Sequence, residues 1–108
     1  MKMIRFMRIL VMFDLPVKSK AERKIASQFR RFLLNDGFYM VQFSVYCRIC
    51  NGYDSVESHE KKISSNIPSR GSVRTLTVTE KQYEGMKLLV GKRRPNEKKF
   101  IEGQLSLF

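Results

Sequence analysis

Residues 6–16 read FMRILVMFDLP, an apolar run that ends in a carboxylate and a proline. A run this short, built of large and β-branched apolar residues, is typical of a buried strand. Pro16 ends the strand because proline has no N–H for the hydrogen-bond ladder. We therefore expect a strand buried on both faces at the centre of a sheet, with Asp14 at its C-terminal end.

Asp14 has two interpretations at this point. A carboxylate is costly to bury without a partner. It therefore either caps the turn before Pro16 or binds something at the end of the sheet. The strand alone leaves both open.

Charge and size limit the class of protein. The 108 residues fit one compact domain, and 43% hydrophobic residues exclude a disordered chain. The formal net charge of +11 favours a nucleic-acid partner. A merely soluble basic protein or a ribosomal-type binder stays open as an alternative. The apolar run is too short for a membrane span, so we expect no signal peptide, no membrane partner and a cytoplasmic location.

Cys47 and Cys50 have the C-x-x-C spacing of a zinc or redox site. No second pair follows, and His59 is the chain's one histidine. We therefore expect two reduced thiols on or near a strand end rather than a metal site.

Three helices are indicated by capping signals. Ser19 and Glu22 form a capping box, and Gly37 supplies a left-handed C-terminal cap. Asp54 or Ser55 is expected to cap a second helix that Pro68 stops. A second capping box, residues 79–82, opens a short third helix.

Period-two patterns indicate the remaining strands. Residues 38–49 alternate and are expected to bend into two pieces, residues 73–79 are rich in β-branched side chains, and residues 86–91 are expected to be a last core strand. The order predicts an α+β, ferredoxin-like βαββαβ sandwich over residues 1–91. Residues 92–108 form a basic connector and an apolar end, expected to be an added C-terminal strand in a homodimer.

Several charged residues are candidates for contacts or for capping. His59 is expected to be a solvated histidine, and capping explains Asp36, Asp54 and Glu80. No base-reading motif is visible, so binding should be independent of sequence and sensitive to salt. The candidates for contacts with a nucleic-acid backbone are Arg23, Arg30, Arg31, Arg70, Arg74, Lys92, Arg93 and Arg94.

Three stretches together carry a resemblance to a known family. They are LVMFDLP at residues 10–16, GFYMVQFSVY at residues 37–46 and LTVTEKQY at residues 76–83. In order and spacing they resemble the small CRISPR-associated nuclease-like protein that partners the CRISPR integrase in spacer acquisition. The residues of these motifs are most similar to those of the family members found in type II CRISPR systems.

The resemblance implies a ferredoxin-like homodimer with Asp14 as catalytic residue and metal ligand. One Mg²⁺ ion would lie between the Asp14 side chains of the two subunits. The implied partners are the integrase, a double-stranded DNA protospacer and, for some members, RNA.

Two hypotheses follow from the resemblance, and a third is independent of it. In the first, the protein is a scaffold that holds duplex DNA and the integrase, with Asp14 dispensable. In the second, it is a metal-dependent endonuclease that hydrolyses RNA or DNA through the paired Asp14 residues. The third is a ferredoxin-like RNA-binding module outside CRISPR systems, in which Phe43 and Tyr46 would supply exposed aromatic rings.

Overall fold

The sheet is four-stranded and antiparallel throughout. The computed structural model describes residues 5–92, and its sheet has the order β2-β3-β1-β4. The strands are β1 (Phe6–Asp14), β2 (Tyr39–Gln42), β3 (Val45–Asn51) and β4 (Ser72–Thr79). This order, with helices between β1 and β2 and between β3 and β4, confirms the expected α+β, ferredoxin-like arrangement.

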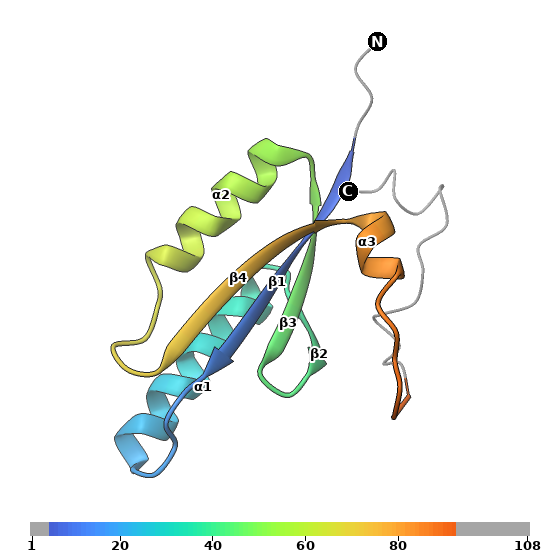
Figure 1. Ribbon diagram of the computed structural model, residues 1–108. Helices are drawn as coiled ribbons and strands as arrows, with labels where there is room; N and C mark the ends of the chain where they lie inside the picture. The colour runs from blue at the N-terminus through green and yellow to red at the C-terminus, as the bar shows by residue number, and fades with distance from the viewer. Residues whose placement is uncertain (1–4, 93–108) are drawn as a thin grey trace.

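Two helices cover one face of this sheet, as Figure 1 shows. They are α1 (Lys20–Asn35) and α2 (Tyr53–Ser64), and a short α3 (Glu80–Glu84) follows β4 directly. Every second side chain of β1 points toward α1 and α2, because successive residues of a strand face opposite ways. The core that results contains Met7, Ile9, Val11 and Phe13 of β1, Phe29 and Leu33 of α1, and Val56 and Ile63 of α2.

The capping signals at α1 and α3 are confirmed. The Ser19 hydroxyl accepts from the Glu22 amide, and the Glu22 carboxylate accepts from the Ser19 amide at 2.9 Å. This backbone hydrogen bond lowers the pKa of Glu22. Thr79 and Gln82 form the same reciprocal pair at α3. At α2 the expectation was wrong, because Gly52 is the N-cap and neither Asp54 nor Ser55 precedes the helix.

The second face of the sheet is largely open. We expected β1 to be buried on both faces, but Leu10 and Met12 on this face are only partly buried in a single chain. Leu76 of β4, paired with Leu10, is 50% exposed. The difference arises because α1 and α2 both lie on the other side, and α3 is the one helix within residues 5–92 that reaches this face, at the Arg8 end of β1.

The expected core strand at residues 86–91 is not formed. This segment is irregular, with Leu89 87% exposed and Val90 89% exposed. Its apolar, β-prone composition predicted a strand, but a strand also needs a neighbour, and no strand among residues 5–92 pairs with it.

Two expectations about the ends of the chain stay predictions. The domain boundary at residue 91 is untested, and the C-terminal strand lies outside the described residues. Within residues 5–92, no helix has the length and apolar character needed to cross a membrane.

Candidate metal and nucleic-acid site

Asp14 is the last residue of β1, and its side chain is exposed. The β-ladder pairs Asp14 with Ser72 and Met12 with Arg74, which places the carboxylate on the open face of the sheet. Among residues 5–92, no hydrogen bond or ion pair engages this carboxylate. The interpretation of Asp14 as a turn cap therefore finds no bond to support it.

Backbone contacts fix the position of Asp14. The amide of Phe13 donates to the Ser44 carbonyl oxygen at 3.0 Å, and Ser44 holds a positive φ of 64°. On the opposite side, Gly71 has φ of +88°, and a Cβ at this position would overlap the Asp14 carbonyl oxygen. Only glycine fits so close an approach at such a dihedral angle.

The residue before Asp14 faces the core instead. The Phe13 ring packs edge-on against Phe29, with centroids 5.3 Å apart, and stacks on Tyr46 at 5.6 Å. The Arg30 guanidinium carbon lies 5.9 Å from the centroid of the Phe13 ring. The hydrophobic packing of Phe13 thus anchors the end of β1 that carries Asp14.

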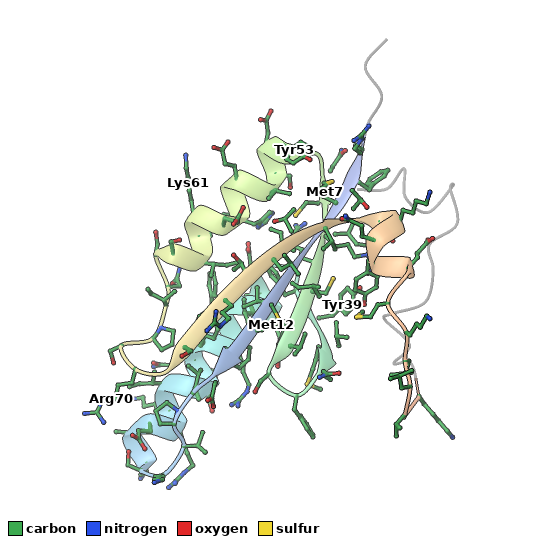
Figure 2. All side chains as sticks on the ribbon, in the orientation of Figure 1. Met7, Met12, Tyr39, Tyr53, Lys61 and Arg70 are labelled. Carbon is green, nitrogen blue, oxygen red and sulfur yellow. The ribbon has the colours of Figure 1, made fainter. Side chains whose placement is uncertain are left out.

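The basic candidates do not form one cluster. Arg23 donates to the Val17 and Lys18 carbonyl oxygens at the start of α1, and Arg70 lies 3.6 Å from Glu22 nearby. Figure 2 shows Arg70 beside this end of α1. Arg74 is on the open sheet face, in register with Met12. The remaining candidates are Arg30, which is partly exposed, Arg31 and Lys92, which are exposed, and Arg93 and Arg94, which lie outside the described residues.

Unlike Asp14, a second charged residue of β1, Arg8, is buried, and the sequence alone did not lead us to expect this. Arg8 is 1% exposed, and its guanidinium donates to both Glu80 carboxylate oxygens, with Nη2–Oε2 at 2.8 Å. It also donates to the Tyr39 hydroxyl, and its Cζ lies 3.9 Å from the centroid of the Tyr83 ring. Tyr39 lies on the side of the sheet toward α3 in Figure 2. We name the set of Arg8, Glu80, Tyr39, Tyr83 and Cys47 the Arg8 cluster.

Burial or hydrogen bonding raises the pKa values of three groups of the Arg8 cluster, which are Arg8, Tyr39 and Cys47. Burial alone lowers the pKa of Arg8, but the hydrogen bond to Glu80 and the interactions with Tyr39 and Cys47 together outweigh it, so the net shift is upward. Burial raises the pKa of Tyr39 and of the Cys47 thiol. Glu80 is therefore more than a capping residue. The signal that could have indicated this was an arginine inside an apolar strand, which requires a partner of opposite charge.

His59 was expected to be solvated, and this was wrong. It is 8% exposed, and its Nδ1 lies 2.7 Å from Asp36 Oδ2, while Lys62 Nζ lies 3.4 Å from Asp36 Oδ1. The Asp36 carboxylate thus joins the end of α1 to α2. Capping alone does not explain Asp36, because its side chain also pairs with His59 and Lys62 of α2, a helix that is distant from Asp36 in the sequence.

The two cysteines are free and buried, as expected. Cys47 is paired with Leu10 on the open face of the sheet, while Cys50 is paired with Met7 on the core face. A spacing of three residues in a strand points the thiols in opposite directions, which rules out a shared zinc ion or a disulfide. Burial raises the pKa of Cys50 as it does that of Cys47. Residues 5–92 contain no group of three or more His, Cys, Asp or Glu side chains suited to a metal.

Comparisons with known proteins agree with the resemblance. A family model described as "CRISPR associated protein Cas2" matches residues 7–86. A protein of Acidovorax ebreus named "CRISPR-associated endoribonuclease Cas2" is 59% identical over 102 residues, which cover 94% of this chain and 100% of that protein. A protein of the same name from Campylobacter jejuni is 49% identical over 104 residues, covering 96% of this chain and 73% of that protein. Another, from Flavobacterium psychrophilum, is 45% identical over 96% of this chain and 90% of its own length.

Proposed function

Because this chain belongs to the family of CRISPR-associated protein Cas2, we propose that it serves CRISPR adaptation as a homodimeric scaffold. In this role it binds a double-stranded DNA protospacer and docks the CRISPR integrase during spacer acquisition. The family membership makes the third hypothesis, an RNA-binding module outside CRISPR systems, wrong.

One observation carries the proposal of a homodimer. Helices α1 and α2 cover only one face of the sheet, and the open face presents the partly buried Leu10 and Met12 beside the exposed Leu76. The irregular segment that follows α3 is also apolar and exposed, including Leu89 and Val90. A second copy would cover the apolar part of this face, around Leu10 and Leu76, and could offer this segment a strand edge to pair with.

Charge supports the proposal of a nucleic-acid partner. A net charge of +11 on 108 residues produces a strong positive field, and phosphate is the usual counterpart of such a field. The candidate cations lie on α1, on the loop before β4 and on β4 itself, so they could follow a backbone around the molecule. Binding of this kind weakens with salt, with a slope of about 0.9 per phosphate contact in a log–log plot.

The relatives are named endoribonucleases, and this name favours a second candidate function, an endonuclease that we infer to depend on a metal ion. Asp14 offers an exposed carboxylate with no competing partner among residues 5–92. One carboxylate per chain is a poor site for Mg²⁺, which prefers near-octahedral oxygen ligands. A dimer that brought two Asp14 side chains together would supply two ligands, with water and phosphate oxygens filling the rest. When bound there, Mg²⁺ would act as a Lewis acid on the scissile phosphate.

The substitution Asp14→Asn separates the two candidates. The endonuclease predicts that this variant loses Mg²⁺-dependent cleavage of RNA or DNA, because the amide removes the charge that holds the ion. The scaffold predicts that it keeps salt-sensitive duplex binding and supports spacer acquisition with the integrase. Asp54→Asn in the first turn of α2 is the matched control, since it also removes one exposed carboxylate.

A separate result would overturn each of the two candidate functions. Cleavage by Asp14→Asn at the wild-type rate would overturn the endonuclease. A wild-type dimer whose affinity for duplex DNA does not change with salt would overturn the scaffold as a binder of the DNA backbone.

A further inference from the structure

Phe43 is the most exposed aromatic side chain among the large apolar residues that the structure describes. The residue is 83% exposed at the turn between β2 and β3. The flanking Gln42 is exposed and Ser44 is partly buried, so polar side chains border the ring in the sequence. A protein interface favours contiguous apolar surface, whereas an isolated ring with polar neighbours suits a flat ligand with polar edges.

The turn places Phe43 at the end of the sheet that carries Asp14. The residue after Phe43, Ser44, adopts a positive φ of 64°, which non-glycine residues seldom do. Its carbonyl oxygen accepts from the amide of Phe13, the neighbour of Asp14, at 3.0 Å. Backbone in a sparsely populated conformation persists where the surroundings fix it. The turn therefore fixes the backbone next to Phe43 at the Asp14 end of the sheet.

A cation shares this end of the sheet. Arg74 of β4, Met12 of β1 and Val45 of β3 form one row across the open face, and Phe43 lies two residues before Val45. A positive group near an exposed aromatic ring is the combination by which proteins hold single-stranded nucleic acid. The ring takes the base, and the cation takes the phosphate.

We propose that Phe43 is a stacking platform for an unpaired nucleobase, which it holds beside Asp14 while Arg74 contacts the phosphate backbone. This inference rests on the proposed function and adds to it an unpaired stretch of nucleic acid as a ligand of the Asp14 end. A base within an intact duplex cannot use the ring, because both of its faces are already stacked on neighbouring bases.

The test compares the affinity of the full-length protein for a short labelled oligodeoxyadenylate with its affinity for a blunt duplex of equal length. Stacking predicts that Phe43→Ala weakens single-strand binding about 10-fold more than duplex binding. Phe43→Leu keeps apolar bulk without a π-face, and it should behave like Phe43→Ala. Phe43→Trp should bind the single strand at least as well as the wild type. Since the chain has no other tryptophan, fluorescence of this variant should be quenched when the single strand binds.

Tyr53→Ala is the matched control. Tyr53 is 64% exposed in the first turn of α2, at the far end of the molecule from Arg70 in Figure 2. The substitution Tyr53→Ala should leave the ratio of the two affinities unchanged. An oligoriboadenylate in a parallel arm decides whether the base comes from RNA or DNA.

The proposal is overturned if Phe43→Ala leaves the ratio unchanged, or if Phe43→Leu binds the single strand like the wild type. It is also overturned if Phe43→Ala changes the mass measured by light scattering, because the ring then belongs to an interface between proteins. Duplex binding by the wild type is a separate readout, and its failure would overturn the proposed scaffold rather than the role of Phe43.

Discussion

The charged side chains at the two ends of β1 lie in opposite environments, one buried and one exposed. Arg8 and Asp14 project from the same face of the same strand, yet Arg8 is 1% exposed and bound to Glu80, while Asp14 is exposed. At the Arg8 end, α3 covers the sheet and supplies both the carboxylate and the Tyr83 ring. At the Asp14 end, the backbone of Gly71 and Ser44 fixes the strand and leaves the carboxylate accessible. The difference separates a charge that holds the fold together from one that is available to a ligand.

The largest effect should follow from breaking the Arg8 cluster. Arg8→Met leaves Glu80 without its partner in a setting where its side chain is only 20% exposed, and loss of one member of a buried ion pair costs about 4 kcal/mol. Asp14→Asn is the matched change at the other end and should alter the free energy of unfolding by less than about 0.5 kcal/mol. Urea denaturation of both variants measures the difference.

The double variant Arg8→Met and Glu80→Gln sharpens this test. Removing both charges leaves no unpaired ion, so the pair of substitutions should cost less than Arg8→Met alone. Equal destabilisation by Arg8→Met and Asp14→Asn would show that the two ends of β1 do not differ in the way described.

A smaller effect is expected from the backbone that positions Asp14. Gly71→Ala combines a positive φ with a steric overlap on the Asp14 carbonyl oxygen, and we expect it to cost about 2 kcal/mol. Gly52 has a similar φ of +92° but open space at its Cβ position, so Gly52→Ala should cost only the dihedral strain and should destabilise the protein less than Gly71→Ala. Thermal unfolding of the two variants isolates the overlap.

The same pair of variants connects stability to the site. Gly71→Ala should also reduce any Mg²⁺-dependent cleavage that requires Asp14, because the strand end must move to accept the methyl group. Gly52→Ala should not reduce it. If both substitutions have the same effect on stability and on cleavage, Gly71 does not position Asp14.

Local signals predicted the parts of the molecule that depend on neighbours in sequence. The apolar run of β1, the capping boxes at Ser19 and Thr79 and the β-branched composition of β4 each led to the correct element. Asp14 was located at the end of its strand for the same reason. Its roles as metal ligand and catalytic residue remain predictions.

The parts that sequence reasoning missed depend on contacts between distant residues. Arg8 and Glu80 are 72 residues apart, and Asp36 and His59 are 23 apart, so no periodic pattern connects them. Glu80 and Asp36 already had an explanation as capping residues, which concealed their second partners. The segment at residues 86–91 failed for a related reason, because β-propensity cannot say whether a pairing strand is present.

The smallest effect concerns alkaline pH, which should act on the Arg8 cluster. Burial raises the pKa of Cys47 and of Tyr39, and Cys50 on the other face of β3 shares this shift. In the unfolded chain a thiol ionises near its ordinary pKa of about 8.5. Above that pH the unfolded state binds fewer protons than the folded state, so the free energy of unfolding must fall as pH rises.

The cysteines' share of this loss can be measured directly. We expect the urea midpoint of the wild type to fall between about pH 7 and pH 9.5, a range in which thiols ionise and most tyrosines do not. The variant Cys47→Ala with Cys50→Ala should show a shallower fall, because its unfolded state has no thiols to ionise. Identical pH slopes for the two proteins would mean that the thiols ionise equally in both states, and the buried end of β1 would then be open to solvent like the Asp14 end.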